Sequence, residues 1–182
     1  MIFKTQFASG CMLVMGGAKS GKSSFALKTC NDLNLKRIFL ATAQAFDQEM
    51  AERIRRHQSE RGGSWQTVEE PLDLVDRIRE MDGPGTVILI DCLTLWLSNQ
   101  FMKHETDHAA VYEAMDALTE HLSEIRGAVV AVSNEVGAGI VPENALSRSF
   151  RDVAGLLNQQ IASIAYKVVV TFAGLPMVLK DE

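Results

Sequence analysis

The sequence predicts an α/β protein with a mostly parallel sheet, helices on both faces and a C-terminal β-hairpin. Short apolar runs alternate along the chain with longer segments that suit helices, which is the pattern of a largely parallel sheet. The apolar runs are continuous, as expected for strands that are covered on both faces. We expect strands at residues 12–15, 37–42, 65–69, 86–91, 128–133, 166–172 and 176–179, with the last two forming a hairpin around Gly174.

The helices between these strands are placed by their start and stop signals. Asp47 suits an N-cap position, Gly62-Gly63 ends the helix that Asp47 begins, and Pro71 suits a first turn. We expect helices at residues 23–31, 47–60, 71–81, 93–102, 109–126 and 143–165.

Length and composition limit the function classes. The 182 residues suit one domain at residues 11–182, after an N-terminal extension at residues 1–10. A net charge of −5 with no long basic run argues against a nucleic-acid partner. Three widely spaced cysteines predict neither a disulfide framework nor a zinc site. No apolar run approaches the ~20 residues of a membrane span, and residues 1–10 lack a secretory signal, so we expect a cytoplasmic protein.

The stretch at residues 16–23 matches the phosphate-binding pattern G-x-x-x-x-G-K-[ST] and consists of Gly16, Gly17, Ala18, Lys19, Ser20, Gly21, Lys22 and Ser23. An apolar run precedes this phosphate loop and a helix-compatible run follows it, which is the context that the motif requires. Backbone N–H groups of such a loop and the N-terminus of the following helix attract phosphate. Lys22 would contact the outer phosphates and the Ser23 hydroxyl would bind Mg²⁺. The motif predicts a P-loop NTPase with a RecA-like sheet.

Two further strand ends carry polar groups. Asp91 follows a buried apolar run like a Walker B acid, and can hold Mg²⁺ through water, or it is an ordinary acid at a strand end. The Gly-rich loop at residues 133–142 either contacts substrate or is a plain connection. Arg148 and Arg151 then share a helix face, where they contact phosphates or another subunit, or pair with acids such as Asp152.

His57 lies in the expected helix at residues 47–60, near Arg55, Arg56 and Arg61. A neutral imidazole is a competent nucleophile towards phosphorus, and nearby cations favour the neutral form and attract a polyphosphate. From these residues alone, a solvated basic helix with one surface histidine is the simpler interpretation.

Several sequence blocks together resemble one enzyme family. Besides the phosphate loop they are A-T-A at residues 41–43, D-Q-E-M-A-E-R-I-R-R-H at 47–57, W-Q-T-V-E-E-P at 65–71, I-D-C-L-T at 90–94, N-E-V-G-A-G-I-V-P-E-N at 134–144 and F-R-D at 150–152. In this order they are similar to the bifunctional adenosylcobinamide kinase / adenosylcobinamide-phosphate guanylyltransferase family of cobalamin biosynthesis. The blocks around His57 and at residues 134–144 are the specific ones.

The resemblance implies two reactions. ATP or GTP phosphorylates adenosylcobinamide, and GTP then donates GMP to adenosylcobinamide phosphate through a GMP–histidine intermediate, giving adenosylcobinamide-GDP and pyrophosphate. It makes His57 the nucleophile, on a helix that must swing over the bound nucleotide, with Gly62-Gly63 as a hinge. It also implies a homo-oligomer, with a trimer favoured. Beyond the phosphate loop, the implied nucleotide contacts are Ala41, Thr42, Ala43, Gln58, Ser59, Glu60, Arg61, Glu69 and Asp91.

Two other functions compete with this interpretation. A P-loop kinase of a small metabolite would use His57 only to bind phosphate, and would keep its activity when His57 is replaced. A nucleotide-binding regulatory subunit would bind nucleotide without transferring any group to a cobinamide. A RecA-type motor on nucleic acid is disfavoured by the acidic net charge.

Overall fold

The structure is a computed structural model, and it describes residues 9–44, 48, 52, 63–105 and 107–182. Most of the expected N-terminal extension and of the expected helix at residues 47–60 therefore lies outside the described residues. Within that expected helix only Gln48 and Glu52 are described, and both are helical.

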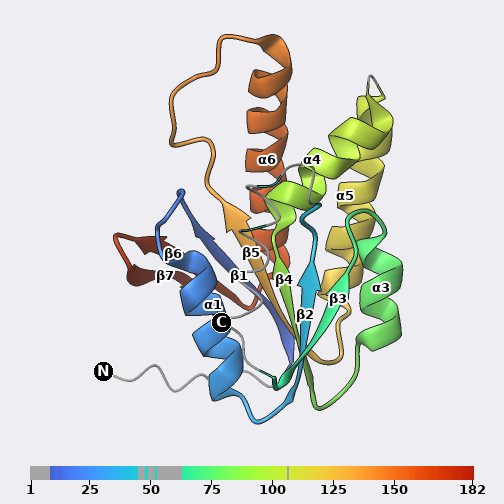
Figure 1. The fold of residues 1–182 in the computed structure, drawn as a ribbon, viewed down its shortest axis with the longest axis vertical. Coiled ribbons are helices and arrows are strands. Elements are labelled where there is room, and N and C mark those ends of the chain that lie inside the picture. Colours follow the sequence, from blue (N-terminus) through green and yellow to red (C-terminus); the bar gives the residue numbers. More distant parts are fainter. Residues whose placement is uncertain (1–8, 45–47, 49–51, 53–62, 106) are drawn as a thin grey trace.

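One sheet organises the molecule (Figure 1). Its strands lie in the order β3-β2-β4-β5-β1-β6-β7. Every neighbouring pair is parallel except β6 and β7, which form the expected antiparallel hairpin. The strands are β1 (Gly10–Gly16), β2 (Lys36–Ala41), β3 (Trp65–Glu69), β4 (Thr86–Asp91), β5 (Ala128–Asn134), β6 (Lys167–Phe172) and β7 (Leu175–Asp181).

Helices cover both faces of this sheet, as the sequence predicts (Figure 1). Helix α1 packs on one face, and α3, α4, α5 and α6 pack on the other. The described helices are α1 (Lys22–Asp32), α3 (Leu74–Met81), α4 (Leu93–His104), α5 (His108–Ser123) and α6 (Ala145–Ile164).

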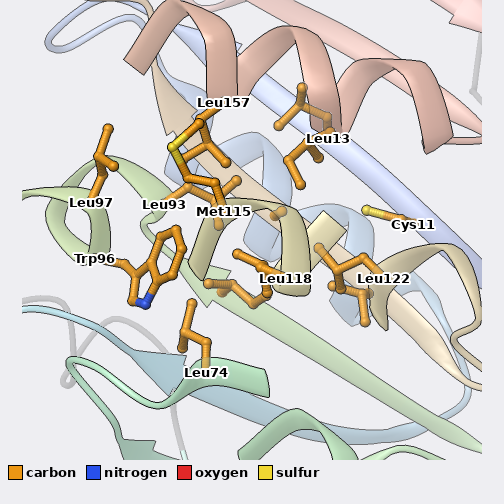
Figure 2. Packing of buried hydrophobic residues seen from close by; sticks show 14 of the residues in the cluster. Cys11, Leu13, Leu74, Leu93, Trp96, Leu97, Met115, Leu118, Leu122 and Leu157 are labelled. Carbon is orange, nitrogen blue, oxygen red and sulfur yellow. The ribbon is translucent and has the colours of Figure 1, made fainter. Parts of the chain in front are cut away.

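The core lies in two layers because successive strand residues point to opposite faces. In β1, Cys11 and Leu13 face the layer under α3 to α6, whereas Met12 and Val14 face α1. Figure 2 shows the larger layer, where Trp96 of α4 packs near Met115 and other buried residues. The Trp96 indole N–H donates to the Leu72 carbonyl over 2.8 Å, so its polar edge is satisfied.

Element boundaries depart from the sequence prediction where side chains cap the backbone. The helix expected from Pro71 begins at Leu74 instead, because the Glu70 carboxylate accepts the backbone N–H groups of Leu72 and Asp73. Burial alone would raise the pKa of Glu70, but these bonds and Arg77 lower it. The last helix begins at Ala145, two residues later than expected, since Asn144 is its N-cap and accepts from the Ser147 N–H.

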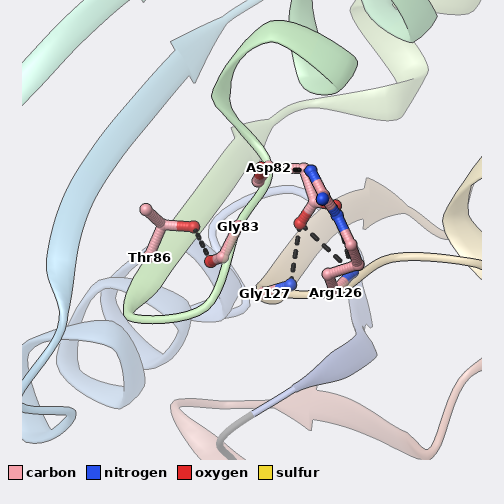
Figure 3. A network of polar contacts seen from close by, with 5 residues as sticks. All are labelled: Asp82, Gly83, Thr86, Arg126 and Gly127. Atoms are coloured by element: carbon pink, nitrogen blue, oxygen red, sulfur yellow. Dashed lines mark hydrogen bonds and ion pairs between the residues drawn. The ribbon is translucent and has the colours of Figure 1, made fainter.

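A buried carboxylate joins two loops at the end of the sheet opposite the phosphate loop (Figure 3). Asp82 accepts hydrogen bonds from the backbone N–H groups of Arg126 and Gly127 and from the Arg126 guanidinium. Its side chain is only 6% exposed. Burial by itself would raise the pKa of Asp82, but these donors outweigh it and the pKa lies below its usual value.

Candidate nucleotide site

The phosphate loop connects the end of β1 to the start of α1, which is the arrangement that the motif requires. Gly21 is the N-cap of α1 and has a φ of 96°, a left-handed conformation that favours glycine. The Lys22 ammonium donates to the Gly17 carbonyl over 3.1 Å, so its side chain lies across the loop. Positive charge and the helix N-terminus therefore meet where a phosphate would bind.

The β6–β7 hairpin packs against the phosphate loop and is hydrogen-bonded to it. The Gly174 N–H donates to the Ser20 carbonyl over 2.9 Å. The hydroxyls of Ser20 and Thr171 are hydrogen-bonded at 2.8 Å, and the Thr171 hydroxyl also donates to the Met15 carbonyl. A Cβ added to Gly21 would lie 3.1 Å from the Gly174 Cα, so this approach requires glycine.

These contacts were not predictable from local sequence. Ser20 and Thr171 are 151 residues apart, and neither residue type marks the pairing. Gly174 was recognised only as a turn residue of the hairpin. The parallel pairing of β1 with β6 brings the hairpin beside the phosphate loop.

The expected contacts on β2, β3 and β4 lie together at the carboxyl edge of the sheet. Ala41 is in register with Glu69 of β3 on one side and with Asp91 of β4 on the other. Asp91 is in turn opposite Val132 of β5, the strand beside β1. Ligands of parallel α/β sheets bind at this edge, so the register agrees with the predicted site.

The electrostatic environment of Cys92 indicates that this edge and the phosphate loop are close in space. The pKa of the Cys92 thiol is raised to about 11, mainly by burial and then by the negative charge of Asp91, while the positive charge of Lys22 acts in the opposite direction. Both charges must therefore lie near the same sulfur. Asp91 at the end of β4 and Lys22 at the start of α1 thus both lie near Cys92.

Thr42 has a structural contact that the sequence did not reveal. Its side chain is buried, donates to the Cys92 carbonyl and accepts from the Cys92 N–H, both over 2.8 Å. Its carbonyl accepts from the Asn99 amide, which also donates to the Pro71 carbonyl. The hydroxyl of Thr42 thus joins β2 to β4, while neighbouring Ala43 is half-buried.

The loop after β5 is tied to the phosphate loop and to α6. The Glu135 N–H donates to the Gly16 carbonyl over 3.1 Å. Arg148 donates to the carbonyls of Pro142 and Glu143, and Arg151 donates to that of Gly137. Both arginines therefore hold this loop in place, a contact that the sequence analysis did not predict.

The remaining predicted residues lie outside the described part of the chain. They are His57, Gln58, Ser59, Glu60 and Arg61. Their roles stay predictions.

Comparison with known proteins fits this geometry. A phosphate loop at the carboxyl edge of a mostly parallel sheet defines a nucleotide-binding protein of the P-loop class. Two solved structures share the fold at low sequence identity. The flagellar accessory protein FlaH from Methanocaldococcus jannaschii matches with a TM-score of 0.51 and 14% identity, covering 95% of this chain and 79% of that one. The RadB recombinase matches with a TM-score of 0.50 and 13% identity, covering 90% of this chain and 75% of that one. The RecA-like fold class is confirmed.

Sequence comparison defines the family. Residues 12–179 match the family described as cobinamide kinase / cobinamide phosphate guanyltransferase. The chain is 44% identical to the bifunctional adenosylcobalamin biosynthesis protein CobP of Pseudomonas aeruginosa, covering 93% of this chain and 97% of that protein. It is 37% identical to CobU, the protein of the same description from Escherichia coli K12, covering 93% and 99%. The chain therefore belongs to this family of bifunctional kinases and guanylyltransferases of cobalamin biosynthesis, which confirms the resemblance.

Proposed function

We propose that the chain performs both family reactions at the phosphate loop, with His57 as the carrier of GMP. In the first, the acceptor hydroxyl of cobinamide attacks the γ-phosphorus of ATP or GTP, the bond to the β-phosphate breaks, and ADP or GDP and the hydroxyl proton are released. In the second, a nitrogen of His57 attacks the α-phosphorus of GTP and the bond to pyrophosphate breaks. A phosphate oxygen of cobinamide phosphate then attacks that phosphorus, the P–N bond breaks and the histidine is restored.

The observation that carries this proposal is the match over residues 12–179 to a family that is named for both activities. The phosphate loop, with Lys22 folded across it, agrees with a site that binds polyphosphate. In the sequence, the cluster Arg55, Arg56 and Arg61 near His57 also favours a histidine that meets a polyphosphate. Splitting a nucleotidyl transfer into two steps is the usual advantage of a covalent intermediate.

We include Mg²⁺ in this proposal, held by Ser23 and Asp91. A hydroxyl and a carboxylate are oxygen ligands of the kind that Mg²⁺ prefers, and Asp91 lies close enough to the phosphate loop to share an electrostatic environment with Lys22. Within the described residues no group of three or more histidines, cysteines or acids could hold a metal ion. Nucleotide oxygens and water would therefore complete its shell, and the ion would offset the charge of the leaving pyrophosphate.

The proposed assembly is a homo-oligomer, a trimer by resemblance to the family. The hairpin of β6 and β7 ends the sheet and exposes large apolar side chains there: Phe172 is 76% exposed, Leu175 69% and Leu179 61%. An exposed apolar edge of this kind is typical of a protein contact. Light scattering tests this proposal, and the mass of a monomer at working concentration would refute it. Leu179→Lys should then lower the measured mass.

The proposed compartment is the cytoplasm. All three cysteines, Cys11, Cys30 and Cys92, are buried and free, which agrees with a reducing environment. In the described part of the chain, no helix combines the length and apolarity that crossing a membrane would take.

The decisive experiment uses GTP labelled at the α-phosphate, with Mg²⁺ and without corrinoid. The wild-type protein should acquire an acid-labile, base-stable label that His57→Ala lacks. His104→Ala, a change at another histidine, should label like the wild type. Adding cobinamide phosphate should then move the label from protein to corrinoid.

The other outcomes separate the rival functions. Nucleotide binding with no label on the wild type would remove His57 from the mechanism. If cobinamide were still phosphorylated, the chain would be a kinase alone; if it were not, the chain would be a regulatory subunit.

A further inference from the structure

A cleft of about 600 Å³ lies between α4 and α6, separate from the phosphate loop. Its apolar walls come from Phe101 and Met102 of α4 and from Leu146 and Phe150 of α6. Two serines and Glu105 are the other described residues of the lining. The volume falls within the ~300–1,000 Å³ of small-molecule sites. We call this feature the α4–α6 cleft.

The cleft lies on the same side of the molecule as the nucleotide site. Helix α4 starts directly after Asp91 at the end of β4, and α6 follows the loop that leaves the end of β5. Both helices therefore project beyond the carboxyl edge of the sheet, as Figure 1 shows. From Leu93 to Met102 is nine residues, or ~14 Å along the helix. A bulky substrate could thus occupy the cleft while one arm reaches the phosphates.

The charge of the described lining does not suit a second nucleotide. Among the residues that the structure describes, no lysine, arginine or histidine lines the cleft, and the charged residue there is Glu105. A polyphosphate needs cations or a row of free N–H groups, which the phosphate loop already supplies. The α4–α6 cleft suits a large ligand that is apolar over much of its surface and is not anionic.

The floor of the cleft is preformed. The Phe101 ring packs edge-to-face on Phe150 at 5.6 Å between centroids and also contacts His108 at 5.4 Å. The rim is exposed: Met102 is 52% and Leu146 62% accessible to solvent. Rigid aromatic walls under exposed apolar side chains are typical of a site that a ligand covers.

We propose that the α4–α6 cleft binds the corrin ring of the cobinamide acceptor, placing the acceptor arm towards the phosphate loop. This assignment rests on the family function, in which cobinamide is the acceptor. Cobinamide carries no phosphate, and its large ring bears methyl groups and uncharged amides, which suits a largely apolar cleft whose described lining also holds two serines and one carboxylate. The loop between β5 and α6 exposes two more apolar residues, Ile140 and Val141.

The test measures corrinoid binding separately from nucleotide chemistry. Cobinamide binding is followed by equilibrium dialysis with its visible absorbance, for Met102→Gln, Leu146→Gln and the double variant. Leu156→Gln is the matched control, because Leu156 lies on α6 with 39% exposure but does not line the cleft. Nucleotide affinity, labelling by α-labelled GTP and mass by light scattering are measured on each protein.

Each single change in the cleft should weaken cobinamide binding about tenfold, since a side chain covered by the ring contributes roughly that factor. The control should bind like the wild type, and nucleotide affinity, labelling and mass should not change. Unaltered cobinamide binding in the double variant would overturn the proposal. A fall in mass with the loss of binding would also overturn it, because the cleft would then be a contact between subunits.

Failure of the proposed function would give a different result from failure of the cleft assignment. If the wild type bound nucleotide but neither bound cobinamide nor phosphorylated it, the acceptor itself would be wrong and the assignment of the cleft would fall with it. Loss of cobinamide binding in the cleft variants alone would support both the proposed acceptor and the assignment of the cleft.

Discussion

Replacing Thr171 with valine tests whether the hairpin holds the phosphate loop in shape. The Thr171 hydroxyl lies 2.8 Å from the Ser20 hydroxyl and 3.3 Å from the Met15 carbonyl, in a residue that is 1% exposed. Valine is nearly isosteric but cannot bond to either group. Leaving a buried polar group without its partner costs ~1–3 kcal/mol.

Two measurements follow from that cost. For a domain of this size each kcal/mol lowers the melting temperature by about 2–4 °C, so Thr171→Val should melt about 2–12 °C below the wild type. Nucleotide affinity should fall at least about fivefold, because the phosphate loop must be ordered again when nucleotide binds. Calorimetry and nucleotide titration check the two effects. Thr67→Val, on the exposed side of edge strand β3, is the matched control and should change stability by less than ~0.5 kcal/mol.

A double-mutant cycle isolates the pair. Ser20→Ala removes the other hydroxyl, so a protein that carries both changes leaves neither hydroxyl of the pair without its partner. The double variant should therefore be more stable than the sum of the single effects predicts, by ~0.5–3 kcal/mol. Additive effects, together with wild-type nucleotide affinity in Thr171→Val, would refute the argument that the hairpin braces the loop.

Three further predictions concern other parts of the structure. Asp82→Asn should lower the free energy of unfolding at pH 7 by ~2 kcal/mol, because charge-assisted bonds to Arg126 and Gly127 are weakened. The pKa of Asp82 is lower in the folded state than the ~4 of an unfolded aspartate. Its contribution to the free energy of unfolding is therefore present above pH ~4 and is lost as the pH falls through the folded-state pKa. Urea denaturation should show the stabilities of the two proteins converging below pH ~4. Gly21→Ala should weaken nucleotide binding at least tenfold by titration, because φ is 96° and its Cβ would lie 3.1 Å from the Gly174 Cα, a strain of ~1–3 kcal/mol. Asn99→Ala should cost ~2–4 kcal/mol in urea denaturation, because the buried Thr42 carbonyl and the partly buried Pro71 carbonyl lose their donor.

Controls and contrary results differ among these three. Asp76→Asn changes an exposed acid on α3 and should not alter the pH dependence; an Asp82→Asn deficit that persists unchanged at pH 3 would contradict the pKa argument. Gly17→Ala meets no atom within 4 Å at its Cβ, so equal losses in Gly17→Ala and Gly21→Ala would show that contact with Gly174 is unimportant. A stable Asn99→Ala protein would mean that water replaces the amide.

The phosphate loop shows how much of the site the sequence could predict. Its glycines, Lys22 and Ser23 act through their own backbone and through the adjoining helix, so a contiguous pattern was enough to locate them. Asp91 was found for a related reason, because a carboxylate at the end of a buried strand must lie at the carboxyl edge of a parallel sheet. The roles of His57 and Gln58 to Arg61 rest on resemblance, and these residues lie outside the described structure.

The sequence by itself determined the alternation of strands and helices, the nucleotide class and the family, because each depends on local periodicity or on contiguous residues. Only the tertiary structure decided which distant residues support the site. Thr171 and Gly174 reach Ser20 through the pairing of β1 with β6, and Asn99 reaches Thr42 across 57 residues. The walls of the α4–α6 cleft likewise come from two helices that are far apart in the sequence. Such contacts depend on strand order and helix packing, which no single stretch of sequence encodes.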